Sequence, residues 1–187
     1  MTGCRALTPD EVTEISNSFY GKHATRNRCL FILGINTGFR VSELLSLKVR
    51  DVWNNAEPRG MIKVQRSSMK GKKRSREIYL NDKARQAVRE WMLEANASPD
   101  APLFHSQKGG AINRQQAHKI LKAVFDDCHL DGTLATHTMR KTFADRVYGL
   151  TGDVFKVSTL LGHGSVDSTV SYLGMTTSEQ HSIITRI

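Results

Sequence analysis

The sequence predicts a mainly helical α+β fold with one small antiparallel β-hairpin. Most of the chain carries apolar residues at helical spacing between recognisable cap residues. Two short segments alternate like strands instead, at residues 61–65 and 76–80. The length of 187 residues and the 39% hydrophobic content indicate one domain with a core, or one domain and a small appendage. We expect residues 1–187 to form a single domain.

The first helices are predicted from caps and glycine stops. Thr8, with Glu11 three residues later, has the pattern of a capping box and predicts a helix over residues 8–20. A second helix is predicted over residues 24–37, ended by Gly38. A short third helix follows, with its apolar residues at Val41, Leu44, Leu45 and Leu47.

The hairpin comes next, and more helices follow it. Two are predicted from their caps, one from Asn81 or Asp82 and one from Asn113. Two more are predicted from about His137 to Gly149 and from Asp153 to Leu161, where Gly162 is a natural C-terminal stop. Ser165 is predicted to cap another helix, which carries Tyr172. An amphipathic piece over residues 179–187 ends the chain. The segment from about residue 176 is expected to pack on its own domain or on a neighbouring subunit.

The charge of the chain favours a polyanionic partner. The net charge is +9, and residues 61–76 hold seven Lys or Arg and no acid. Such a run is commonly a solvated loop, but between two strands it predicts a basic hairpin tip that fits a phosphate-lined groove. The three cysteines are widely spaced, and no apolar run is long enough to cross a bilayer. These features predict a cytoplasmic protein.

Three places hold polar residues that helix packing does not explain. They are TGFRVSELL with Arg40 and Glu43, THTMRKTFAD with His137 and Arg140, and TLLGHGSVDSTVSYLG with His163 and Tyr172. Each alone has an ordinary interpretation, since a helical arginine commonly makes a surface ion pair and a helical tyrosine commonly packs at the edge of a core.

Taken together, these blocks resemble the catalytic domain of the tyrosine recombinase, or phage integrase, family. Arg40 matches the first arginine box, HTMR matches the His-x-x-Arg box, and LLGH matches the third box, with Tyr172 at the family's spacing after His163. The basic hairpin lies where the family carries a catalytic lysine, and Lys70 aligns best, ahead of Lys72 and Lys73. The resemblance implies the tyrosine recombinase catalytic-domain fold, in a protein that is bacterial or phage-encoded and associated with the nucleoid.

The resemblance also implies site-specific cleavage and rejoining of DNA strands through a 3′-phosphotyrosyl intermediate, for integration, excision or inversion of a segment. The implied catalytic residues are Arg40, Lys70, His137, Arg140, His163 and the nucleophile Tyr172, with Glu43 as structural support. The DNA contacts expected are Lys72, Lys73, Arg74, Arg76 and Arg114. Gln115 and Gln116 belong to the same helix start as Arg114 and are DNA contacts or a solvated face. The implied assembly is a tetramer on two recombination sites, with a monomer in isolation.

No metal or other cofactor is expected. Two-metal nucleases need clustered carboxylates, whereas the 18 acids are scattered along the chain. No ATP is needed either, because the phosphotyrosyl ester keeps the energy of the broken bond.

Several alternatives stay open at the level of sequence. Family members commonly carry an N-terminal helical domain for which this chain has no room, so it is an excised catalytic domain or resembles short members that invert promoter segments. A type IB topoisomerase shares related machinery, although the short length and LLGH favour a recombinase. A DNA-binding regulator that keeps the fold without catalysis is the alternative from another functional class. The target DNA sequence is not predicted.

Overall fold

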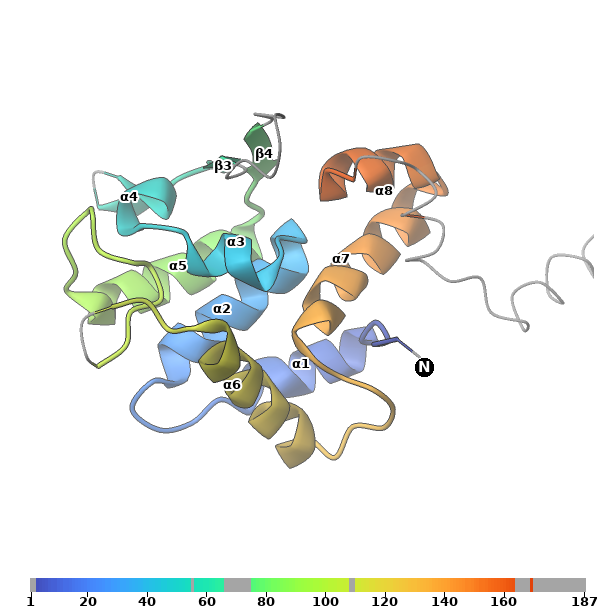
Figure 1. Cartoon of the computed structure of the whole chain (residues 1–187), viewed down its shortest axis with the longest axis horizontal. Helices are drawn as coiled ribbons and strands as arrows, with labels where there is room; N and C mark the ends of the chain where they lie inside the picture. Colours follow the sequence, from blue (N-terminus) through green and yellow to red (C-terminus); the bar gives the residue numbers. More distant parts are fainter. Residues whose placement is uncertain (1–2, 55, 66–74, 108–109, 164–168, 170–187) are drawn as a thin grey trace, which may run out of the picture. The chain divides into compact units, whose positions relative to one another are not determined.

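The computed structural model describes residues 3–54, 56–65, 75–107, 110–163 and 169. The chain divides into two compact units, Met1–Phe143 and Ala144–Ile187 (Figure 1). The predicted helix after Ser165, the piece at 179–187 and the tip of the basic hairpin lie outside the described residues. Within the described part of the chain, no helix is long and apolar enough to span a membrane.

The first unit is built around α2 (Ala24–Thr37), with the bounds that the sequence predicts. This helix is buried on nearly all sides, and α1 (Pro9–Asn17) and α5 (Asp82–Ala95) pack against it (Figure 1). The predicted capping box at Thr8 is confirmed, because Glu11 and Thr8 bond each other's backbone N–H groups. α1 ends at Asn17, earlier than expected, because Ser18 N–H already bonds the Ile15 carbonyl in a tight last turn.

A run of very short elements links α2 to the basic hairpin. It consists of α3 (Val41–Leu45), α4 (Val49–Val52) and two antiparallel two-residue strands, β1 (Trp53–Asn54) and β2 (Glu57–Pro58). Only α3 was predicted. Elements of two to four residues are too short to display either a helical or an alternating period, so the sequence gives no signal for the others.

The predicted hairpin is present as β3 (Met61–Gln65) and β4 (Ser75–Tyr79), an antiparallel pair in which Met61 lies opposite Tyr79. Buried and exposed residues alternate along the strands, as expected from the sequence. Ile62, Val64 and Ile78 are buried, whereas Lys63 and Glu77 face outward and form an ion pair of 2.9 Å.

Two of the remaining helices begin at their predicted caps, because Asn81 caps α5 and Asn113 caps α6 (Arg114–Asp127). α8 (Val154–Leu161) ends at Gly162 as predicted, and Asp153, expected as its first residue, is its N-cap. α7 (Thr136–Thr151) starts in the first unit and continues into the second. It ends two residues later than expected, because Gly152, with φ of 60°, is the glycine that adopts the left-handed conformation, whereas Gly149 is helical.

Candidate active site

The turn between α2 and α3 carries the first predicted catalytic residue. Gly38 ends α2 in the left-handed conformation, with φ of 60°, and its N–H bonds the Gly34 carbonyl at 3.1 Å. A Cβ at this glycine would collide with the Phe143 ring, so both conformation and space require glycine here. The chain then turns outward, and Arg40 becomes the N-cap residue of α3.

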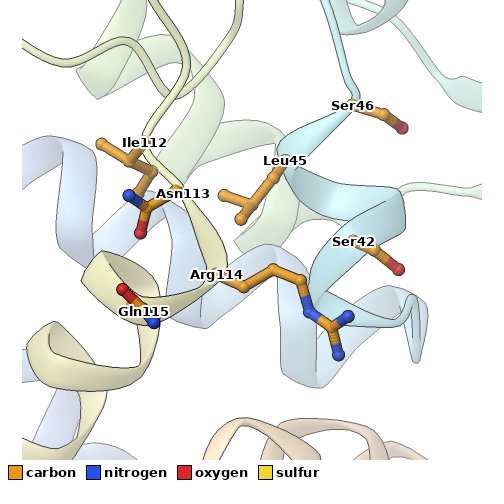
Figure 2. Close-up of a pocket in the computed structure, with 7 residues that line it drawn as sticks. All are labelled: Ser42, Leu45, Ser46, Ile112, Asn113, Arg114 and Gln115. Atoms are coloured by element: carbon orange, nitrogen blue, oxygen red, sulfur yellow. The ribbon is translucent and has the colours of Figure 1, made fainter.

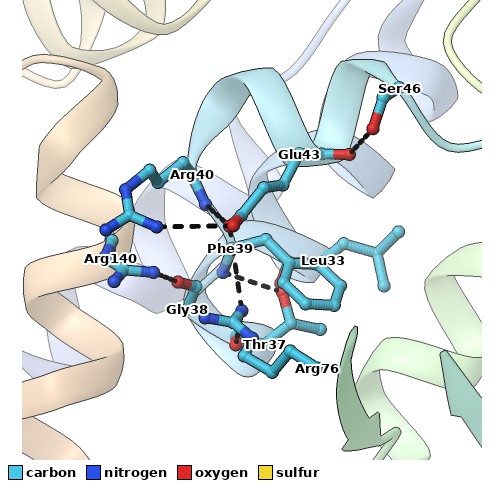
Figure 3. Close-up of polar contacts among 9 residues, drawn as sticks. All are labelled: Leu33, Thr37, Gly38, Phe39, Arg40, Glu43, Ser46, Arg76 and Arg140. Carbon is cyan, nitrogen blue, oxygen red and sulfur yellow. Dashed lines mark hydrogen bonds and ion pairs between the residues drawn. The ribbon is translucent and has the colours of Figure 1, made fainter. Parts of the chain in front are cut away.

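Glu43 holds Arg40 through its main chain and its side chain. One carboxylate oxygen accepts the Arg40 backbone N–H at 2.6 Å, and the other lies 3.4 Å from Arg40 Nη1 (Figure 3). The Arg40 side chain is 39% exposed and the Glu43 side chain is 15% exposed. The carboxylate therefore sits inside the protein and orients an arginine that still reaches solvent, which is what a supporting role requires.

Arg140 approaches the same turn from α7. It is 2% exposed, and its Nη1 donates a hydrogen bond to the Gly38 carbonyl. Figure 3 shows the side chains of Arg40 and Arg140 on the same side of the turn. The two predicted arginines, a hundred positions apart along the chain, are thus brought together by one backbone turn.

Arg76, on β4, reaches the turn as a third arginine. Its Nη2 donates to the Thr37 carbonyl at 3.1 Å and lies 4.0 Å from Glu43 Oε2. Its guanidinium carbon lies 4.4 Å from the centre of the Phe39 ring, a cation–π contact. Only 10% of the side chain is exposed, and its expected role as a DNA contact stays a prediction. Sequence reasoning missed this arrangement, because nothing local to β4 indicates that Arg76 turns inward.

His137 is exposed in the first turn of α7, three residues before Arg140. Partial desolvation lowers the pKa of its imidazole, and the positive charges of Arg140, Arg40 and Arg114 lower the pKa further. The ring is therefore neutral near pH 7 and can accept a proton. The same three charges show that His137 lies in the cationic surroundings that an anionic substrate needs.

A groove lies between α3 and the start of α6. It has a volume of about 600 Å³ and is lined by Ser42, Leu45, Ser46, Ile112, Asn113, Arg114 and Gln115. Figure 2 shows Arg114 extending from α6 toward α3, on the side of Ser42. A second hollow of about 570 Å³ shares Arg114 and Gln115 and adds His118 and Lys119. Among the described residues, none that lines either hollow is acidic, so the surface suits a polyanion. The Gln116 side chain takes part in the helix cap, where its oxygen accepts the Asn113 backbone N–H at 2.8 Å.

His163 belongs to the second unit and is held by the end of α8. Gly162 has a left-handed φ of 64°, its N–H bonds the Thr159 carbonyl, and the His163 N–H bonds the Ser158 carbonyl. This is the Schellman arrangement, in which the residue after the glycine is fixed by the helix end. His163 Nδ1 lies 2.7 Å from the buried Thr169 hydroxyl, which orients the ring.

Five predicted site residues fall outside the described part of the chain. They are Lys70, Lys72, Lys73, Arg74 and Tyr172. Their expected roles stay predictions. Within the residues that are described, no group of three His, Cys, Asp or Glu side chains could hold a metal ion.

Comparisons with known proteins give one consistent result. The family model for the phage integrase family matches residues 5–179. The chain is 36% identical over 155 residues to tyrosine recombinase XerD of Corynebacterium glutamicum, an alignment that covers 81% of this chain and 49% of that protein. It is 30% identical over 167 residues to the probable integrase/recombinase YoeC of Bacillus subtilis, covering 89% of this chain and 86% of that one. The chain therefore spans about half the length of the XerD relative.

Solved structures share the fold. The crystal structure of XerA recombinase superposes with a TM-score of 0.79 at 22% identity, covering all of this chain and 66% of that one. XerH site-specific recombinase bound to palindromic difH substrate gives a TM-score of 0.76 at 24% identity, covering 96% of this chain and 52% of that one. These similarities support the predicted mainly helical fold with small antiparallel sheets.

Proposed function

We propose that this chain, which belongs to the phage integrase family, is a site-specific DNA recombinase that works through a 3′-phosphotyrosyl intermediate on Tyr172. The reaction would integrate, excise or invert a DNA segment. The observation that carries the proposal is the convergence of Arg40 and Arg140 on one turn, with neutral His137 in the same cationic surroundings.

The arginines suit the transition state of phosphoryl transfer. A pentavalent phosphorus carries extra negative charge on its non-bridging oxygens, and guanidinium groups stabilise such oxygens with charge-assisted hydrogen bonds. Arg40 and Arg140 would form the clamp, and His163 would add a third donor. Loss of one preorganised donor of this kind typically slows a reaction by about a hundred- to a thousand-fold.

Two proton transfers complete the proposed mechanism. The Tyr172 phenol, with an ordinary pKa of about 10, must lose its proton when it attacks phosphorus. His137 is neutral near pH 7 and would accept that proton or orient the phosphate. The leaving 5′-oxygen needs a proton, which Lys70 on the hairpin would donate. Attack of the free 5′-hydroxyl on the phosphotyrosyl ester reverses the steps, so neither a metal nor ATP is required.

The proposed partner is double-stranded DNA. The cationic groove beside Arg114 and the net charge of +9 support DNA binding. Solved relatives of the same fold include XerH and the Tn1549 transposon integrase in complex with DNA. By analogy, the working assembly would hold four chains on two sites, with the isolated chain a monomer.

A suicide DNA substrate tests the proposal directly. We expect the chain to form a covalent adduct on a denaturing gel, in the presence of EDTA, and the adduct to disappear in Tyr172→Phe, which removes only the attacking oxygen. Sequencing the trapped DNA would then give the target site. A shifted band on a native gel without any adduct would instead identify a DNA-binding regulator.

A further inference from the structure

We propose that Arg76 is a positioning residue of the recombination centre, which acts on the phosphate clamp through Glu43 and the turn between α2 and α3. This proposal rests on the proposed function. Arg76 would not itself touch the scissile phosphate. Its task would be to share the Glu43 carboxylate, so that Glu43 orients Arg40 without neutralising it.

The first support is the burial of the Arg76 side chain against the turn between α2 and α3. Its side chain is 10% exposed, whereas Lys63 on the neighbouring strand is 55% exposed. It combines the bond to the Thr37 carbonyl with the contact on the Phe39 ring. Only a planar guanidinium can stack on a ring and donate sideways at the same time, so a lysine could make just part of this contact.

The second support is the pattern of carbonyl groups at the end of α2. Arg76 takes the Thr37 carbonyl and Arg140 takes the Gly38 carbonyl. Carbonyls at a helix C-terminus carry a partial negative charge and favour cations. β4 and α7, which are far apart in sequence, are thus fixed to two consecutive peptide units that precede Phe39 and Arg40.

The third support is the position of Glu43 between two cations. The carboxylate lies 3.4 Å from Arg40 Nη1 and 4.0 Å from Arg76 Nη2. The two arginines and the glutamate together carry a net charge of +1 (2 − 1), which favours an incoming phosphate. Without Arg76, the partly buried Glu43 would have Arg40 as its partner at the turn and would cancel the charge that the phosphate needs.

The predicted consequence is a rescue by a second substitution. Arg76→Gln reduces the summed charge of Arg40, Glu43 and position 76 from +1 to 0, and DNA cleavage should slow by about 10- to 100-fold, the range known for loss of a group that orients a metal ligand. Adding Glu43→Gln restores the +1 charge, while the glutamine oxygen can still accept the Arg40 backbone N–H. The double variant should therefore cleave faster than Arg76→Gln alone. Arg76→Lys, which keeps the charge, should lose less activity than Arg76→Gln.

The matched control is Arg26→Gln. Arg26 is also a buried arginine, 5% exposed, whose Nη1 bonds the His105 carbonyl at 2.9 Å, but it lies at the start of α2, away from the turn. Single-turnover adduct formation at saturating DNA, the Kd for DNA and the Tm are measured for every variant. Arg26→Gln should lower the Tm and leave the cleavage rate of the folded protein unchanged.

The outcomes separate the possible roles of Arg76. Slower cleavage with an unchanged Kd, and rescue by Glu43→Gln, supports the positioning role. Three outcomes would overturn it: Arg76→Gln cleaves at the wild-type rate, its loss of cleavage is fully explained by a weaker Kd, or the double variant cleaves no faster than Arg76→Gln. In each of these cases the adduct formed by the wild-type chain leaves the proposed function intact. Absence of an adduct in the wild-type chain overturns both.

Discussion

Arg40 and Arg140 meet at one turn but differ in what surrounds them. Arg140 is buried and holds the Gly38 carbonyl, so it contributes to the fold as well as to the proposed clamp. Arg40 is more than a third exposed, and its side chain contacts the largely buried carboxylate of Glu43. Residues with the same proposed role in chemistry should therefore differ in their effect on stability.

Alanine at each position tests this difference. Arg40→Ala and Arg140→Ala should both abolish cleavage and leave much of the DNA binding, because other basic residues contact the DNA backbone. Arg140→Ala should also lower the free energy of unfolding by about 1–3 kcal/mol, since a buried carbonyl loses its donor. Urea unfolding and adduct assays check both effects. Equal destabilisation by Arg40→Ala, or complete loss of DNA binding in both variants, would contradict these assignments.

The imidazole of His137 gives a prediction for pH. Its pKa in the folded protein lies below the unfolded value of about 6.5. At a pH between these two pKa values, the unfolded chain therefore binds more protons than the folded protein. The contribution of His137 to the free energy of unfolding should therefore rise with pH across that window and stay constant above it. His23 also has a lowered pKa, which burial causes first.

The contribution of His137 is obtained by difference. Urea unfolding of the wild type and of His137→Asn at several pH values isolates it from that of His23. Titration of the ring by NMR should give a pKa below 6.5 in the free protein, and a higher pKa once an anion such as vanadate occupies the clamp. A ring pKa at or above 6.5 without any anion would disprove the arrangement described for α7.

At the scale of elements, helix ends place the proposed site residues. Gly38 directs the chain into Arg40, and Gly162 fixes His163 through two backbone hydrogen bonds. Gly152 also has a φ of 60°, but no atom of the described residues lies within 4 Å of a Cβ built at this position. The glycines at 38 and 152 therefore share a backbone conformation and differ in packing.

Alanine substitution separates conformation from packing. Gly152→Ala should cost about 1–2 kcal/mol, the price of a left-handed alanine. Gly38→Ala should cost about 1–3 kcal/mol more, because its Cβ also collides with the Phe143 ring. Only Gly38→Ala should slow cleavage, since it shifts the turn that precedes Arg40. Equal free energies of unfolding for the two variants would show that the Phe143 ring moves aside at little cost in free energy.

At the scale of the whole molecule, the excess of positive charge should govern DNA affinity. With 27 basic and 18 acidic residues, binding should weaken linearly on a plot of log K against log salt concentration. The basic segment 66–74 and the groove at α6 are the two regions expected to contribute. Lys122, by contrast, is exposed on α6 and paired with Asp126.

Single charge removals show which lysines contact phosphate. Lys72→Gln should reduce the slope of that plot by about 0.9, the loss of one phosphate contact. Lys122→Gln changes the net charge by the same amount and should leave the slope unchanged. Filter binding or fluorescence anisotropy between low and physiological salt measures both. An equal change in the slope for the two variants would mean that net charge, and not local contact with phosphate, controls the affinity.

The sequence alone determined the elements with strong local signals. Thr8, Asn81 and Asn113 were identified as caps because each side chain bonds a backbone N–H three residues away, which is a local interaction. The hairpin, α2 and α3 followed from periodicity and glycine stops. The family boxes around Arg40, Arg140 and His163 were also visible, since resemblance needs only residue type and spacing.

Tertiary structure decided how the side chains are used. Arg76 had the sequence signature of an exposed basic residue, yet it packs on Phe39 and bonds Thr37, nearly forty positions away. The bond from Arg140 to the Gly38 carbonyl spans a hundred positions and leaves no local trace. Local interactions are encoded in neighbouring residues and can be recognised there. Long-range contacts depend on how α2, β4 and α7 meet, because the energy that selects them comes from burial of the whole core.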